Sequence, residues 1–161
     1  MPGLPPLIEE DVQLLNSVLD ELLQKSESTA ALVIDKGGPI INQRGAADQF
    51  DTTTIAALAA GSFCATQAIA ERLGETSFTS VYQQGERFSL LFWNIDENAL
   101  LIVIFQAQLS AGAVKYYAAG AVPRIAAQLQ RAQQRAPGES LDLVSENVLD
   151  VSAIFSKRRQ N

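Results

Sequence analysis

The sequence predicts an α+β protein in which one five-stranded, mainly antiparallel sheet lies between layers of helices. The element order, α-β-β-α-β-β-β-α, does not alternate strands and helices one for one, as a doubly wound sheet does. The strands are joined by short turns, which favours an antiparallel meander. The stretch LLIVIF (100–105) is apolar on both faces and therefore predicts a central strand covered by helices on both sides.

The first part of the chain predicts a helix and then a hairpin. Residues 7–25 carry apolar side chains at a helical period, with charged residues on the opposite side. Residues 29–34 (TAALVI) form a β-type run, 35–39 (DKGGP) have turn chemistry, and Ile40 and Ile41 begin a second strand.

A second helix is predicted over residues 55–74, IAALAAGSFCATQAIAERLG. The segment before it, FDTTT, supplies N-cap candidates, and Gly74 is suited to end it. Strands follow at 78–83, 87–93 and 100–105. Ser110 leads into a third helix that continues to about Arg135, and Pro123 favours a start of the regular helix near that proline.

The predicted organisation is one domain, residues 7–136, between an N-terminal tail (1–6) and a C-terminal tail (137–161). The C-terminal tail is acidic until its last residues and has an apolar stripe at helical spacing. This stripe would dock either on its own domain or in a groove of a partner. Its proposed anchors are Val148, Val151 and Phe155.

Composition excludes several function classes. A net charge of −6 and a pI near 4.6 argue against binding nucleic acid or an anionic membrane. No histidine and a single cysteine rule out the usual zinc sites and the commonest general base, and neither nucleotide-binding fingerprint is present. We therefore expect no active site, metal or cofactor. The carboxylates of Asp35, Asp51 and Asp96 are assigned to turns and caps.

The lack of a signal peptide, an apolar run of only six residues at 100–105 and the lone Cys64 predict a cytoplasmic protein without membrane insertion.

Projection of the second helix at 100° per residue separates two apolar stripes. The larger one is predicted to face the sheet and consists of Ile55, Leu58, Ala59, Ser62, Ala65, Thr66, Ile69 and Leu73. The opposite stripe is nearly bare of side chains and consists of Ala57, Ala60, Gly61, Cys64 and Ala68. Small residues at this spacing allow another backbone to approach closely.

The small-residue stripe has two possible covers. One is another helix of the same domain. The other is a second chain, which we favour because the remaining two helices are both needed on the far face of the sheet, and pairing across a two-fold axis is the commonest arrangement. Cys64 is then a packing residue rather than a reactive thiol.

Three stretches, LVIDKGG (32–38), DTTTIAALAAGSFCATQAIAERLGE (51–75) and VYQQGERFSLLF (81–92), resemble Roadblock/dynein light-chain-type domains. The resemblance covers about residues 30–135 and implies a Roadblock/profilin-like fold. Within the family the chain is similar to bacterial members that partner a small Ras-like GTPase, and SENVLDVSAIF (145–155) more weakly resembles their tail.

The resemblance implies a homodimer in which edge strands pair and two subunits bind one GTPase and accelerate GTP hydrolysis without inserting an arginine. The implied GTPase contacts are Ala57, Ala60, Gly61, Cys64, Gln67, Ala68 and Arg72. The implied dimer contacts are Ala57, Gly61, Phe78, Val81 and Gln83. The tail anchors would touch the GTPase and affect nucleotide exchange.

Two other hypotheses remain open. The chain is alternatively a non-catalytic scaffold dimer that assembles other proteins, a role that eukaryotic Roadblock light chains resemble. In the third hypothesis Arg44, Arg72 or Arg87 is an arginine finger supplied to the GTPase.

Overall fold

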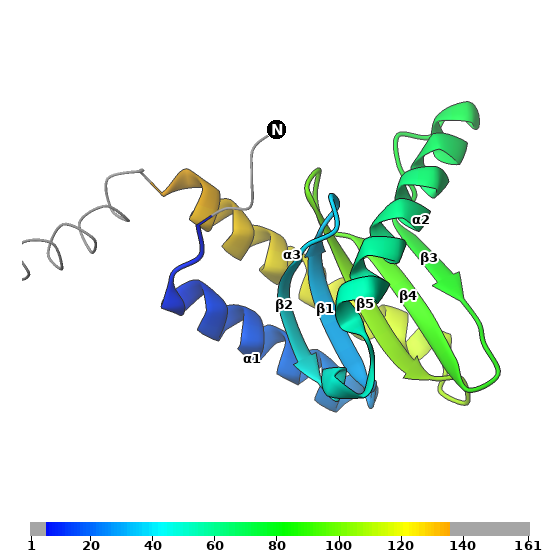
Figure 1. Cartoon of the computed structure of the whole chain (residues 1–161), viewed down its shortest axis with the longest axis horizontal. Helices are drawn as coiled ribbons and strands as arrows, with labels where there is room; N and C mark the ends of the chain where they lie inside the picture. The colour runs from blue at the N-terminus through cyan, green and yellow to red at the C-terminus, as the bar shows by residue number, and fades with distance from the viewer. Residues whose placement is uncertain (1–5, 136–161) are drawn as a thin grey trace, which may run out of the picture.

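The computed structural model describes residues 6–135, in three layers (Figure 1). Residues 1–5 of the predicted N-terminal tail and the whole C-terminal tail, with Val148, Val151 and Phe155, lie outside the described residues. The helices are α1 (Glu9–Ser26), α2 (Thr52–Arg72) and α3 (Ala111–Gln134), with a short 3-10 helix, η1 (Ala47–Gln49), before α2. The strands are β1 (Ala30–Asp35), β2 (Ile40–Gly45), β3 (Ser80–Gln83), β4 (Phe88–Asn94) and β5 (Ala99–Gln106).

The sheet has the strand order β2-β1-β5-β4-β3, and every neighbouring pair is antiparallel. β5 is the central strand, and all its residues except Gln106 are buried. Ile102 pairs with Leu32 of β1 on one side and with Phe92 of β4 on the other. The predicted α+β class, element order and central strand are therefore confirmed.

The two faces of the sheet are covered unequally. α1 and α3 lie together on one face, where Leu15, Leu19 and Ile125 pack against Val103 and Phe105. Among the described helices, α2 and the short η1 cover the other face, over a core that includes Leu32, Ile102 and Phe92. The prediction that two helices share one face is confirmed.

The sequence analysis assigned the wrong side of α2 to the sheet. The residues of α2 that are buried are Thr52, Ala56, Ala59, Ala60, Phe63 and Ala70. Of the stripe predicted to face the sheet, Leu58, Ile69 and Leu73 are 68%, 55% and 68% exposed. Small side chains let the α2 backbone approach the large side chains of β1 and β5, and Phe63 is the large side chain of α2 that enters this core, whereas Leu58, Ile69 and Leu73 are exposed.

The predicted caps of α2 are confirmed, although the helix begins at Thr52, three residues before the predicted start at 55. Asp51 accepts a hydrogen bond from the Thr54 backbone N at 3.3 Å and one from the Thr54 hydroxyl at 2.6 Å. At the other end Gly74 has φ +81°, and the backbone N of Glu75 donates to the Ala70 carbonyl at 2.9 Å. This is a Schellman C-cap, which requires the left-handed conformation that glycine adopts readily.

α3 begins earlier than predicted. Ser110 caps it by accepting from the Ala113 backbone N at 3.4 Å, and Pro123 lies within the helix. Proline removes the hydrogen bond to the carbonyl of Ala119, four residues earlier, but both residues are exposed, so water can satisfy that oxygen.

A buried ion pair fastens the start of α1 to the end of α3. The Asp11 carboxylate is fully buried and accepts two hydrogen bonds from the Arg135 guanidinium, at 2.8 and 3.0 Å. The side-chain amide of Gln128 and the backbone N of Ile8 also donate to it, at 2.6 and 2.9 Å. Arg135 above all lowers the pKa of Asp11 to about 2, against the desolvation that raises it. We call Asp11, Gln128 and Arg135 the helix clamp.

Asp11→Asn should lower the free energy of unfolding at pH 7 by about 2 kcal/mol, because Asn cannot neutralise Arg135. The pKa of Asp11 is depressed in the fold, so its contribution is complete above pH ~4 and is lost as the pH falls toward 2. Urea unfolding of both proteins between pH 7 and pH 2.5 measures this. The exposed Asp48→Asn is the control, and a gap that stays constant with pH would contradict the role of the clamp.

Candidate functional site

The outer surface of α2 is apolar and largely uncovered. Ala57, Gly61, Cys64 and Ala68 are all exposed, and a Cβ built on Gly61 meets no atom within 4 Å. The small-residue stripe is therefore open in the protomer, except for Ala60, which is 7% exposed and belongs to the core. No helix within residues 6–135 covers it, so covering by the same domain is wrong for the described part of the chain.

By length and composition alone, α2 could cross a membrane, and among the described residues it is the one helix that passes this test. Of its most apolar window, 28% is buried. The test is weak evidence, since core helices of soluble proteins also pass it. Here the inner side of α2 packs on the sheet through Ala56, Ala59 and Phe63.

A hollow of about 570 Å³, which we call the α2 groove, runs along one flank of α2. Its walls come from α2, the turn after β1, the segment that follows α2, and the turn between β4 and β5. It is lined by Lys36, Ala60, Phe63, Cys64, Gln67, Ala68, Glu71, Thr76, Ser77, Asn94, Asp96 and Glu97.

Lys36 lies across one wall of the α2 groove. Its ammonium donates to the backbone carbonyl of Asp96 at 2.6 Å and lies 5.4 Å from the centroid of the Phe63 ring. Burial lowers the pKa of Lys36, and the nearby carboxylates of Asp96 and Glu97 oppose that shift. These contacts hold the lysine in place and leave the middle of the groove open.

A chain of amides and a hydroxyl organises the opposite wall. Gln67 donates to the Thr76 carbonyl at 2.8 Å and accepts from the Ser77 hydroxyl at 3.0 Å. The Asn94 side-chain nitrogen donates to the same hydroxyl at 3.3 Å. Within residues 6–135 the buried Oδ1 of Asn94 has no hydrogen-bond donor. Because almost none of this oxygen is accessible, it lies behind the surface of the wall.

The other flank of α2 faces the edge strand β3, and we call it the β3 flank. Here Ile55, Leu58 and Ser62 border a small apolar hollow of about 200 Å³, together with Gln83 and Leu90. The exposed Leu58, Ile69 and Leu73 lie on this side of the helix, and Figure 1 shows the last turns of α2 extending past the sheet. The sequence analysis missed this flank because it assigned these residues to the core.

The structure brings together four of the seven predicted GTPase-contact residues, since Ala60, Cys64, Gln67 and Ala68 all line the α2 groove. The other three lie outside the groove and are exposed, Ala57, Gly61 and Arg72. Arg72 donates to the Ala68 carbonyl at 3.1 Å.

The residues predicted for the dimer fall into two places. Val81 and Gln83 are on the edge strand β3, and Phe78 is half-buried just before it. Ala57 and Gly61 are on the exposed side of α2 instead. Phe63, beside them in sequence, is 3% exposed and belongs to the core under α2.

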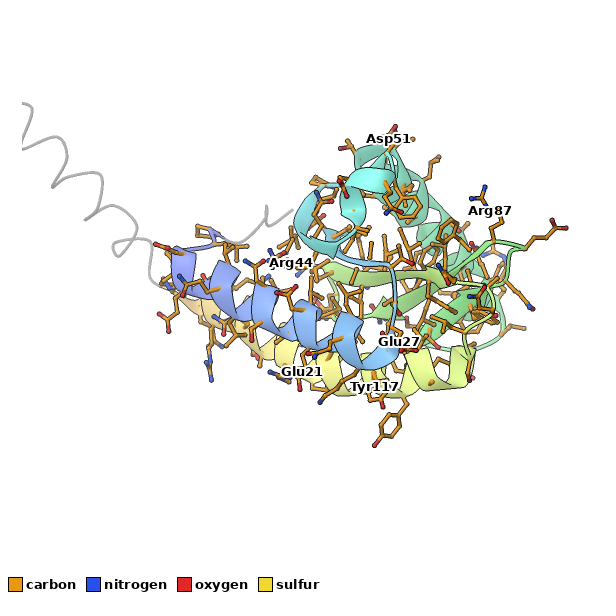
Figure 2. All side chains as sticks on the ribbon, turned by 90° about the horizontal axis from the view of Figure 1, so that it is seen from below. Glu21, Glu27, Arg44, Asp51, Arg87 and Tyr117 are labelled. Atoms are coloured by element: carbon orange, nitrogen blue, oxygen red, sulfur yellow. The ribbon has the colours of Figure 1, made fainter. Side chains whose placement is uncertain are left out.

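The three candidate arginine fingers and the three carboxylates have local partners. Arg44 forms a double hydrogen bond with Asp20 of α1, both at 2.8 Å, and the guanidinium of Arg87 lies 6.0 Å from the centroid of the Phe88 ring. Figure 2 shows the two arginines at different sides of the molecule, Arg44 beside α1 and Arg87 away from it. Asp35 and Asp96 accept backbone hydrogen bonds in their own turns. No group of three metal-ligating side chains occurs among residues 6–135.

Comparison with known proteins supports the predicted family. The model of the Roadblock/LC7 domain family matches residues 14–105. No curated protein sequence matches the chain significantly.

Three solved structures similar to this chain are of MglB. One, with a tetrameric arrangement, is 31% identical at a TM-score of 0.76 and aligns over 82% of this chain and 98% of its own. The gliding protein MglB of Thermus thermophilus is also 31% identical, at a TM-score of 0.75 over 81% and 98%. MglB of Myxococcus xanthus is 26% identical, at a TM-score of 0.75 over 81% and 98%.

Phe63→Ala should lower the free energy of unfolding by about 3–4 kcal/mol, because it leaves a cavity between α2 and the sheet. The exposed neighbour Cys64→Ala is the matched control and should change it by less than about 0.5 kcal/mol. Chemical denaturation measures both. Equal losses for the two variants would mean that another side of α2 packs on the sheet.

Proposed function

The chain belongs to the Roadblock/LC7 domain family, and on this premise we propose that it is a homodimeric regulator of a small Ras-like GTPase of the MglA type. It acts as a GTPase-activating protein or co-regulator in bacterial cell polarity or motility. It works in the cytoplasm, and it has no active site of its own. Its similarity to MglB structures over most of both chains supports this choice within the family.

The observation that carries the proposal is the open, small-residue surface of α2 beside the α2 groove. Ala57, Gly61 and Ala68 leave room for a mobile segment of another protein. Such a surface can bind one arrangement of the partner's switch segments better than the other. The regulator then accelerates hydrolysis by stabilising the reactive arrangement, through differential binding alone.

The candidate arginines and carboxylates already contact groups of their own chain, which supports a regulator without catalytic groups. Arg44 is held by Asp20 on the α1 side of the sheet, away from α2. Arg72 is folded onto its own helix. We therefore assign acceleration to the GTPase's own residues and do not assign it to an inserted arginine.

The proposed homodimer forms through the β3 flank. Within residues 6–135, β3 is an edge strand of four residues, and no other strand pairs with its outer side. Leu58, Ile69 and Leu73 would be buried in the same contact, and Phe78, Val81 and Gln83 lie at the strand itself. Pairing across a two-fold axis brings two α2 helices onto one face, which two subunits then offer to one GTPase.

The proposal gives separate roles to the domain, residues 7–136, and the tail, 137–161. The domain forms the dimer and the α2 surface. The tail is a second contact with the GTPase that affects nucleotide exchange, with Val148, Val151 and Phe155 as its anchors.

Ala68→Arg should abolish binding of the GTPase and its acceleration, because a long charged side chain fills the small-residue surface. The GTPase to use is the one that co-purifies with this protein. Its single-turnover GTP hydrolysis rate is measured with and without excess regulator. The matched control is Ala127→Arg, at an exposed alanine of α3 on the opposite face of the sheet from α2. This variant should keep full activity.

The same assay tests the proposed function as a whole. If excess wild-type protein leaves the hydrolysis rate unchanged while binding persists, activation is wrong and the scaffold hypothesis replaces it. A GTPase that still binds Ala68→Arg would contradict the assignment of the α2 surface.

Leu58→Asp should convert the dimer into monomers, because it places a charge in the proposed apolar contact. Light scattering coupled to size exclusion should show the mass fall from twice the chain mass to the 17.3 kDa of one chain. Leu58 is 68% exposed, so the protomer should stay folded. Tyr116→Asp, at a 74% exposed side chain of α3, is the control and should remain dimeric.

A further inference from the structure

The α2 groove is lined by more acidic than basic side chains. Three carboxylates, Glu71, Asp96 and Glu97, line it against one ammonium, Lys36. Its net charge is therefore negative, which favours a cation and disfavours an anion.

The three carboxylates differ in their hydrogen bonds, and Glu97 also lies near the Lys36 ammonium. Asp96 is engaged, since its Oδ1 accepts from the backbone N of Asn98 and of Ala99 at 2.7 and 2.8 Å. The exposed Glu71 and Glu97 accept no side-chain hydrogen bond from any residue within 6–135. Glu71 comes from α2 and Glu97 from the turn between β4 and β5, so acceptors stand on two walls of the groove.

The remaining surface of the groove suits a long side chain with an apolar stem. Ala60, Cys64 and Ala68 give α2 a side without bulk. Lys36 does not fill the space, because its ammonium is bound to the Asp96 carbonyl and lies over Phe63.

We propose that the α2 groove receives an arginine side chain from the surface of the partner GTPase. A guanidinium presents several donors in one plane and so can engage carboxylates on two walls, whereas the ammonium of lysine is a compact, strongly hydrated charge. The methylene stem packs on the alanines. The inference rests on the proposed function for the origin of the arginine but not for the preference of the groove.

A titration of the full chain followed by ¹⁵N NMR tests the groove without the GTPase. The probe is N-acetyl-arginine methylamide, compared with its neutral isostere N-acetyl-citrulline methylamide and with N-acetyl-glutamate methylamide. The arginine probe should give saturable shifts at Cys64, Gln67, Asn94 and Glu97, with a dissociation constant on the order of millimolar. Shifts of equal size with the citrulline probe, larger shifts with the glutamate probe, or none in the groove would overturn the proposal.

Glu71→Gln combined with Glu97→Gln should abolish the shifts produced by the arginine probe. Binding of the co-purified GTPase to this variant should weaken about tenfold at low salt, with a smaller difference at about 0.5 M salt. Glu75→Gln, an exposed carboxylate outside the groove, is the matched control and should bind normally. Unchanged GTPase binding by the double variant would overturn the proposal.

The two proposals fail in different ways. If the arginine probe binds in the groove but no GTPase binds the wild-type protein, the groove's preference stands and the proposed function is wrong. If the GTPase binds and is activated but the probe does not shift the groove, the function stands and the arginine inference is wrong.

Discussion

The structure depends on the need to cover β5, a strand buried on both faces, with only three α-helices among the described residues. A sheet of five strands is about 24 Å wide at ~4.8 Å per strand, whereas a helix with its side chains is about 10–12 Å across. Two helices can cover one face, as α1 and α3 do, but α2 with the short η1 leaves part of the other face open. The β3 flank is part of this open area. The α2 groove lies instead at one end of the strands, where α2 passes the turn after β1 and the turn between β4 and β5.

Local patterns predicted the elements well because their causes are local. The run of apolar residues at 100–105 requires burial on both faces, and it became β5. Asp51 and Gly74 satisfy the ends of α2 with groups adjacent in sequence. The start of α3 was wrongly predicted near Pro123, because a proline inside a helix is tolerated where the helix faces water.

The rotation of α2 could not be read from sequence, because the helix is apolar on nearly every side and its largest residues need not face the core. The sheet beneath already carries large side chains such as Leu32, Ile102 and Phe92, so it accepts alanines and Phe63. The α2 groove could not be predicted from sequence either, because it brings together residues far apart in the chain. Lys36 and Asp96, which are hydrogen-bonded there, are 60 residues apart. Periodicity predicted Ala60, Cys64 and Ala68, which share one side of a single helix, and Gln67 followed from the family resemblance.

The helix clamp also determines where the last segment of the chain is tethered. Arg135 is held to Asp11 at one end of the α1 and α3 layer, across the sheet from α2. An extended chain spans at most ~3.3–3.6 Å per residue, so about 70 Å separates Arg135 from Phe155 at full stretch. That reach exceeds the width of the sheet several times. A segment tethered at Arg135 is therefore long enough to pass either edge of the sheet and reach a protein bound on α2. Its effective concentration there is set by the length of the tether and does not depend on the concentration of the protein in the cell.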